Sequence, residues 1–307
     1  MRLAVALVTL LLAAAPPSQA QVEAPSRLTL TWENDLLAGT DRHYTNGLRV
    51  ELSGRLDPRV LPEWLASGEA TWGLALGQRI YTPERLDVAG LAADDRPYAG
   101  WSYVALSVTR RVATFGWEDR TELSLGVVGP ASGARATHEF AHELFGSESP
   151  RGWRHQLRNE PAIALDYRAS MRVARWDTGG LACDVRPMLG VSLGNVATFA
   201  SIGITTRVGL GVPTDSGSVL PSPFRVYVTA SAEVRLVGFD VFLDGSLLRR
   251  GGHRVEKERI VADLSIGLVV AIHDRVSLTY VHTLRTPEFE GQVGGDQFGS
   301  VSLAISW

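Results

Sequence analysis

The chain has 307 residues, a formal net charge of −3 and a hydrophobic content of 45%. This length suffices for one large domain, and a charge so close to zero gives no indication of a nucleic-acid-binding protein. The single cysteine, Cys183, cannot form a disulfide within the chain, so the fold does not depend on disulfide bonds.

The N-terminal segment has the three parts of a secretory signal peptide. Arg2 supplies a positive charge, residues 3–15 form an apolar stretch, and Ser18-Gln19-Ala20 provides small residues for cleavage. We therefore expect residues 1–20 to be removed on export and residues 21–307 to form a single mature domain.

Beyond the signal peptide, apolar and polar residues alternate, which is the pattern of β-strands with one apolar face. Leu28, Leu30 and Trp32 alternate with polar residues, and the same pattern continues to Trp307 at the end of the chain. We find no uninterrupted apolar run after the signal peptide that is long enough for a membrane-spanning helix.

A soluble β-sandwich also alternates, but three features favour a membrane barrel. The segments are about ten residues long, as tilted membrane strands are. Their less apolar face is polar, which suits a lumen, and an exported chain that ends in an alternating strand with an aromatic residue is typical of outer-membrane proteins. We predict an all-β fold, an antiparallel transmembrane β-barrel of the bacterial outer membrane. The twelve expected strands are 27–34, 45–54, 70–80, 100–112, 120–129, 161–174, 181–194, 198–210, 224–243, 258–271, 275–286 and 298–307.

Residues 137–160 fall in a long extracellular loop of this barrel, and the loop is expected to contain a short helix. The loop begins with Gly129-Pro130, a typical turn signal. Thr137 is expected to cap the helix and Gly146 to end it.

The predicted helix carries two histidines, His138 and His142, on one face because they are four residues apart. They complete an H-E-x-x-H string, the pattern in which two histidines bind zinc and Glu139 would be the base. Glu160 would then be the third ligand. We disfavour this zinc metalloprotease hypothesis, because zinc proteases place the motif in a soluble helical domain and little helix is predicted here.

Polar residues also lie where the first two strands reach the same end of the barrel. Asn34 and Asp35 end the first strand, and Thr45 begins the second. The alternation places Asn34 on the lipid-facing side with Trp32, and it gives Asp35 the lumen-facing position.

The ordered set of these motifs resembles the outer-membrane lipid A 3'-O-deacylase (LpxR-like) family over essentially the whole mature chain. The residues that carry the resemblance are Glu33-Asn34-Asp35, Asp41-Arg42-His43-Tyr44-Thr45-Asn46-Gly47, Asp95-Arg96-Pro97-Tyr98-Ala99-Gly100, Gly129-Pro130, His142 with Gly146, Gly152-Trp153, Gln156-Leu157-Arg158-Asn159-Glu160 and Phe242-Leu243-Asp244-Gly245.

The resemblance implies an active site between the barrel wall and the loop helix, and calcium-dependent ester hydrolysis. It implies that Asn34 and Asp35 belong to the oxyanion and calcium site, with Asp35 as a Ca²⁺ ligand. Thr45 would line the site, His142 would be the base that activates water, and Glu148 would be a supporting polar residue.

His138 departs from the family, which usually has Gln one turn before the base. The replacement creates the H-E-x-x-H string and makes His138 a candidate site residue, with consequences for the geometry and the substrate of the site.

The chemistry is coherent with these residues. Histidine has the near-neutral pKa that a general base needs, and Ca²⁺ on oxygen ligands supplies positive charge where an oxyanion forms. The string Gly190-Val191-Ser192-Leu193-Gly194 lies within an expected strand and not on a turn from a strand to a helix. We therefore find no G-x-S-x-G nucleophile elbow, which favours water over serine as the nucleophile. We expect a monomer that acts on lipid A or lipopolysaccharide. The alternatives are the zinc protease and a non-catalytic barrel such as a porin.

Overall fold

The computed structural model describes residues 26–39, 42–90, 92–146, 150–214, 224–249, 251–273 and 275–307. The predicted signal peptide, residues 1–20, lies outside these ranges. No helix within the described ranges has the length and apolar character needed to cross a membrane.

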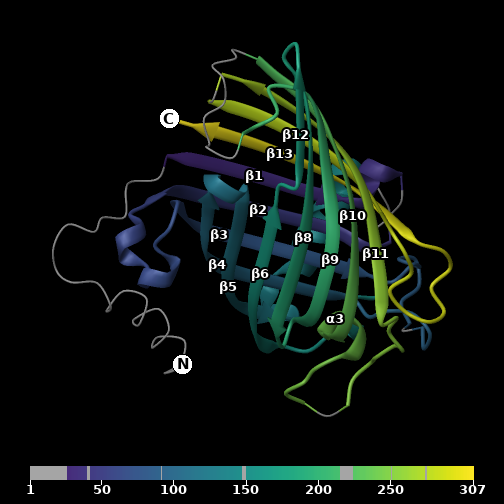
Figure 1. Cartoon of the computed structure of the whole chain (residues 1–307). Coiled ribbons are helices and arrows are strands. Elements are labelled where there is room, and N and C mark those ends of the chain that lie inside the picture. The colour runs from purple at the N-terminus through teal and green to yellow at the C-terminus, as the bar shows by residue number, and fades with distance from the viewer. Residues whose placement is uncertain are drawn as a thin grey trace.

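The strands form one closed antiparallel sheet (Figure 1). Strands that are consecutive in the sequence are neighbours in the wall, β1 pairs with β13, and β6 also pairs with β8. The strands are β1 (Arg27–Asn34), β2 (His43–Leu56), β3 (Glu69–Thr82), β4 (Ala99–Val112), β5 (Trp117–Val128), β6 (Glu160–Met171), β7 (Ala174–Thr178), β8 (Leu181–Gly194), β9 (Ala197–Leu210), β10 (Phe224–Asp240), β11 (Ile260–Ile272), β12 (Val276–Arg285) and β13 (Asp296–Ser306).

The wall has twelve strand positions, as predicted, because β6 and β7 occupy the same position. Both pair with β8, β6 near its end and β7 near its start. Arg172 and Val173 interrupt the expected strand 161–174 between them. The expected strand 224–243 also ends early, at Asp240, whose side chain accepts a hydrogen bond from the Phe242 N–H and caps the short helix α3 (Val241–Asp244).

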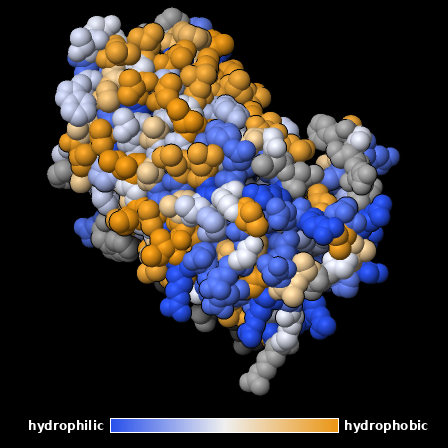
Figure 2. Space-filling view, turned by 90° about the vertical axis from the view of Figure 1, so that its right-hand side faces the viewer, coloured by the Kyte–Doolittle hydropathy of each residue, from blue (hydrophilic) through white to orange (hydrophobic). Residues whose placement is uncertain are grey.

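The outer surface of the wall is apolar, as a surface in contact with lipid must be. Large apolar side chains at alternate positions stay exposed, for example Leu76 on β3, Leu236 on β10 and Leu264 on β11. Figure 2 shows hydrophobic residues gathered over the upper part of one side of the molecule and hydrophilic residues toward its lower end. The alternation in the sequence therefore separates a lipid-facing from a lumen-facing side.

The two ends of the barrel differ in their connections. Ser26 and Trp307 lie at the same end, where the Trp307 N–H donates to the Ser26 carbonyl at 3.1 Å. The opposite end carries the connections that contain η1 (Asp35–Ala38), α2 (Ala134–Phe145), η6 (Trp153–His155) and α3. In outer-membrane barrels the longer loops are extracellular, so this is the extracellular end.

Helix α2 starts four residues earlier than predicted, and Thr137 is not its cap. The short η5 turn (Pro130–Ser132) and Gly133, with a φ of 72°, redirect the chain so that the helix begins at Ala134. The Ser132 hydroxyl accepts a hydrogen bond from the Ala134 N–H at 3.4 Å, which takes over the role of a cap. Gly146, with a φ of 70°, ends the helix as predicted.

Helix α2 is fixed on the outside of the wall, at the extracellular ends of β3 and β4. The Ser132 carbonyl accepts hydrogen bonds from Gln78 Nε2 at 2.8 Å and from Ser102 Oγ at 2.7 Å. Ala134 packs so closely on Gly100 that a Cβ at Gly100 would lie 2.1 Å from the Ala134 Cβ. The absence of a side chain at Gly100 therefore lets the helix approach the strand backbone.

Charged residues that face the lumen from β2 and β5, three positions apart in the wall, form ion pairs. On β2 and β5, Arg49 Nη2 lies 2.8 Å from Glu122 Oε2, and Arg120 Nη2 lies 2.8 Å from Glu51 Oε2. Arg120 lines both an upper cavity of about 370 Å³ and a lower cavity of about 930 Å³. Nearer the extracellular end, Tyr81 stacks on Phe242 of α3 with ring centroids 3.9 Å apart. Side chains therefore obstruct the lumen at two levels and leave these cavities beside them.

We predict that the purified protein carries no steady ion current in planar lipid bilayers. The reason is that the ion pairs around Arg120 and the Tyr81–Phe242 stack obstruct the lumen at two levels. A porin of similar strand number, inserted in the same way, is the control. Stable unitary currents from the unmodified chain would contradict this reading of the lumen and would support the non-catalytic porin hypothesis.

Candidate functional site

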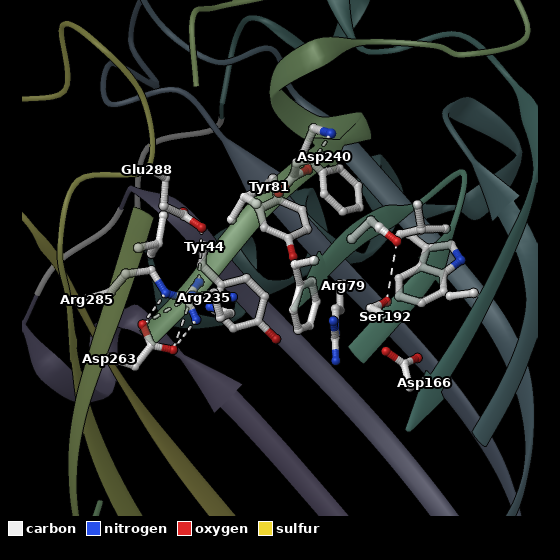
Figure 3. Close-up of a pocket in the computed structure, with 18 of the residues that line it drawn as sticks. Tyr44, Arg79, Tyr81, Asp166, Ser192, Arg235, Asp240, Asp263, Arg285 and Glu288 are labelled. Carbon is white, nitrogen blue, oxygen red and sulfur yellow. Dashed lines mark hydrogen bonds and ion pairs between the residues drawn. The ribbon is translucent and has the colours of Figure 1, made fainter. Parts of the chain in front are cut away.

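The upper cavity of the lumen is a polar space whose charges are largely paired (Figure 3). Asp263 lies between Arg235 and Arg285 and forms ion pairs with both, at 3.2 and 2.9 Å. Asn34, Asp35, Thr45, His138 and His142 are all absent from its lining. The candidate site therefore has to be sought outside the lumen, around helix α2.

The two histidines of α2 are buried and contact each other directly. Their exposed fractions are 3% for His138 and 7% for His142, and their Nε2 atoms are 3.0 Å apart. The Trp153 indole of η6 donates to His138 Nδ1 at 3.1 Å. Ile80, Tyr98, Ala134 and Trp153 form the apolar cluster in which this end of the helix is seated.

The indole contact decides which atoms of the histidine pair carry protons. An indole N–H only donates, so His138 Nδ1 must accept. A neutral His138 then carries its proton on Nε2 and donates it to His142 Nε2. It follows that the lone pair of His142 Nε2 points at His138 and that the His142 proton resides on Nδ1.

His138 is held in its neutral form. Burial, and to a smaller extent the neighbouring His142, lower the pKa of His138 to about 3. A second proton on His138 would also have to displace the Trp153 N–H from Nδ1. At neutral pH, His138 is therefore an uncharged hydrogen-bond donor to His142.

This neutral histidine makes the docking of α2 sensitive to acid. In the unfolded segment His138 has a pKa of about 6.5, so between pH 6.5 and 3 the undocked helix binds a proton that the docked helix does not. Docking therefore loses stability as pH falls through this range, by about 2 kcal/mol at pH 5. We predict that His138→Gln, which can accept from Trp153 and donate to His142, abolishes this loss.

Hydrogen exchange of residues 134–145, corrected for intrinsic rates, measures the effect. The unmodified chain should lose much of its protection between pH 8 and pH 5, whereas His138→Gln should keep it. Glu139→Gln is the matched control, because Glu139 pairs with Arg135 on the exposed side of the helix at 2.8 Å. An equal loss in His138→Gln would show that another group is responsible.

Asn34 ends β1 on the outer side of the wall. Its strand keeps an unbroken register with β2 and β13 up to this residue, so the predicted lipid-facing position of Asn34 is correct. The Asn34 Oδ1 accepts from the Leu36 N–H at 2.7 Å, and its Nδ2 donates to Asn46 Oδ1 over a long 3.5 Å contact. Trp32 Nε1 also donates to Asn46 Oδ1, at 2.8 Å.

Asp35 does not take the lumen-facing strand position that the alternation predicted, because the strand ends at Asn34 and η1 begins at Asp35. Its carboxylate is 1% exposed and its Oδ2 accepts from the Arg42 N–H at 2.5 Å. The Arg42 side chain reaches Glu84 at 2.6 Å and the Gly295 carbonyl at 3.2 Å. The turn that holds Asp35 is therefore fastened to two other extracellular loops.

Thr45 is the extra residue of a β-bulge in β2. The register with β3 shifts between Tyr44 and Asn46, and the Thr45 hydroxyl lies 2.6 Å from that of Thr82 at the end of β3. Thr82 lies two residues beyond Ile80, one of the residues in the cluster that seats α2. The bulge thus directs Thr45 toward the end of β3 that supports the helix.

The structure brings His138 and His142 into direct contact and places Asn34 and Thr45 on neighbouring strand ends. Glu148 lies outside the described residues. Trp153 and Asn46 were not assigned site roles from the sequence, although both belong to motifs identified there. Asn46 lies two residues before Leu48, so the alternation places its side chain on the outer side of the wall as well. The contact between Trp153 and His138 could not be predicted in this way, because it depends on how the loop folds back on α2.

The zinc metalloprotease hypothesis does not fit these positions. His138 uses Nδ1 for Trp153 and Nε2 for His142, which leaves no ring nitrogen for a metal. Glu160 binds Asn195 and Ser246 at the start of β6. Within the described ranges, no cluster of three or more His, Cys, Asp or Glu side chains is arranged to hold a metal ion.

A calcium ion places different demands, because Ca²⁺ accepts backbone carbonyls, amides, water and substrate oxygens besides carboxylates. The donor set at the end of β1 has the right chemistry, with the buried carboxylate of Asp35 next to the side-chain amide of Asn34. These residues fit a site with one carboxylate ligand, in which loop carbonyls, water and a bound substrate would complete the coordination.

One family model and one solved structure agree with this architecture. The family model described as "Outer membrane protein LpxR" matches residues 3–307. The solved structure of LpxR from Salmonella typhimurium superposes with a TM-score of 0.79, at 19% identity, over 92% of this chain and 100% of that one. The β domain of the Bordetella autotransporter BrkA has a TM-score of 0.47, at 9% identity, over 93% and 100% of the two chains. A search of curated proteins finds no match.

Proposed function

This chain belongs to the LpxR family of outer-membrane proteins, and we propose that it is a calcium-dependent lipid A 3'-O-deacylase. The reaction would hydrolyse the ester that links the 3' acyloxyacyl chain to lipid A, with a histidine-activated water as nucleophile. The observation that carries the proposal is the His138–His142 pair, which is buried between a loop helix and the outer, lipid-facing side of the wall. A base in this place lies outside the lumen, on the lipid-facing side of the wall.

His142 is the general base of the proposed reaction. A water molecule takes the place of the His138 N–H at His142 Nε2, gives its proton to this atom and forms a bond with the ester carbonyl carbon. The tetrahedral intermediate then collapses, the bond between carbon and the sugar oxygen breaks, and His142 returns the proton to the leaving oxygen. The products are a free carboxylate and a hydroxyl group on the sugar.

His138 is a positioning residue in this scheme. Because its pKa is about 3, it stays neutral and does not repel the imidazolium that forms on His142. Because Trp153 occupies its Nδ1, its ring keeps a single orientation, with Nε2 toward His142. A glutamine at this position can make the same two hydrogen bonds, which accounts chemically for the exchange of Gln and His.

The oxyanion of the intermediate requires donors or positive charge. The Asn34 amide is one donor, since its contact with Asn46 is long at 3.5 Å and is easily exchanged for a stronger acceptor. Asp35 would hold Ca²⁺ next to this amide, and the bound ion would supply positive charge at the oxyanion. Thr45 would line the same side of the site.

The first test is mass spectrometry of lipid A from cells that produce the protein. We expect lipid A to lose one acyloxyacyl chain in the presence of calcium, and we expect His142→Ala to reduce the rate by about 10²- to 10⁴-fold, the contribution of a general base. His155→Ala is the matched control, because His155 is an exposed histidine of the same loop. Unchanged lipid A, with the folded barrel present and calcium supplied, would refute the proposed activity.

The second test concerns the metal. Asp35→Asn keeps an oxygen that accepts from the Arg42 N–H but removes the negative charge. We expect this variant to need at least tenfold more calcium for half-maximal activity, measured by calcium titration after treatment with chelator. Asp87→Asn, an exposed change in the second loop, should leave the titration unaltered. An Asp35→Asn enzyme with an unaltered calcium requirement would show that the ion binds elsewhere.

A further inference from the structure

The wall below helix α2 contains an open apolar groove of about 570 Å³. Val50, Leu76, Val104 and Leu125 form its lower row and are directly paired across four neighbouring strands. All four side chains are on the lipid-facing side and are between 37% and 61% exposed. The groove is therefore continuous with the surface that contacts the hydrocarbon of the membrane.

Two further rows connect the groove to the polar site. The row above contains Leu48, Gln78 and Ser102, and the next contains Asn46, Ile80 and Gly100. Each step covers two residues along a strand, or about 7 Å. Asn46 is the partner of Asn34 in the sheet, and Ile80 and Gly100 contact α2. Leu48 thus connects the apolar row to Asn46, the neighbour of the proposed oxyanion donor, while Gln78 and Ser102 beside it bind the turn that precedes the helix with the histidines.

Helix α2 forms the roof of the groove through Thr137. Phe140 and Leu144 lie on the same flank of the helix as Thr137, and they are 64% and 66% exposed. The charged residues Arg135 and Glu139 lie on the opposite flank, where they pair with each other. The helix therefore turns an apolar edge toward the groove and a charged edge away from it, as a helix at a membrane surface does.

We propose that this groove binds the ester-linked acyl chain of the lipid A substrate, with Phe140 and Leu144 immersed in the outer leaflet. The proposal rests on the deacylase function and specifies how the substrate is oriented. A lipid of the outer leaflet has its sugar headgroup at the extracellular surface and its acyl chains below. Its ester linkage would then lie level with Asn34 and His142. The acyl chain would extend from there along β2, past Leu48 and Val50.

Photolabelling tests the groove separately from catalysis. The probe is lipid A with a diazirine near the end of an ester-linked acyl chain, presented in vesicles to the His142→Ala protein, and the labelled positions are mapped by mass spectrometry. We expect labels to concentrate on β2–β5 around Leu76, and we expect Leu76→Trp, which fills the groove, to reduce them at least tenfold. Leu236→Trp on β10 is the matched control, because Leu76 and Leu236 are both 61% exposed to lipid.

Labels spread evenly around the barrel, or labels in the groove that Leu76→Trp does not reduce, would overturn the proposal. Equal labelling of the groove by a diazirine phosphatidylethanolamine would overturn the assignment to lipid A. If Leu76→Trp does not assemble, Val104→Trp in the same row replaces it. Groove labelling of the His142→Ala protein, together with unchanged lipid A in cells that produce the unmodified protein, would instead refute the deacylase function and leave the acyl-chain site in place.

Discussion

The structure depends on one constraint, which is that a chain in lipid must satisfy every backbone N–H and C=O group internally. The closed sheet does this, since the pairing of β1 with β13 and of β6 with β8 closes the wall. Closure has a second consequence. Each strand has one side in lipid and one in the lumen, so any functional group on the wall must belong to one of these two environments.

Charged side chains of the barrel strands occupy the lumen. Buried arginines and carboxylates are costly unless they are paired, and here they are paired between β2 and β5, as in the contacts of Arg49 with Glu122 and of Arg120 with Glu51. In the extracellular loops, burial alone would raise the pKa of Glu288, but the charges of Arg285, Arg96 and Arg235 outweigh it and lower this pKa to about 2. A lumen filled in this way provides rigidity, and it leaves the outer side of the wall for the histidine pair.

The architecture could be predicted from the sequence because the alternation directly reports the two environments of each strand. The details that failed are those in which the alternation stops. Asp35 was placed by continuing the strand parity one residue past the expected strand 27–34, but η1 begins at this residue. Thr137 was placed as a cap from its residue type, but the Ser132 hydroxyl and Gly133 start the helix at Ala134.

Only part of the candidate site could be predicted from the sequence, for a related reason. His138 and His142 are neighbours in any helix, so their contact follows from their spacing. The bulge at Thr45 and the hydrogen bond from Trp153 to His138 depend instead on tertiary packing, which no local pattern encodes. The outer groove is also a tertiary feature, because its rows are formed by residues of four strands in register.

The H-E-x-x-H string shows how one sequence motif can support different chemistry in different structures. In a zinc site both histidines would direct a lone pair at a common point. Here the Trp153 N–H takes the Nδ1 lone pair of His138 and thereby forces its Nε2 to donate to His142. One indole therefore converts a potential ligand pair into a donor and an acceptor. The same hydrogen bond opposes a second proton on His138, which lies beside His142, the residue that must become cationic if it is to act as a base. The tryptophan, rather than the spacing of the histidines, therefore determines whether the pair acts as metal ligands or as a donor and a base.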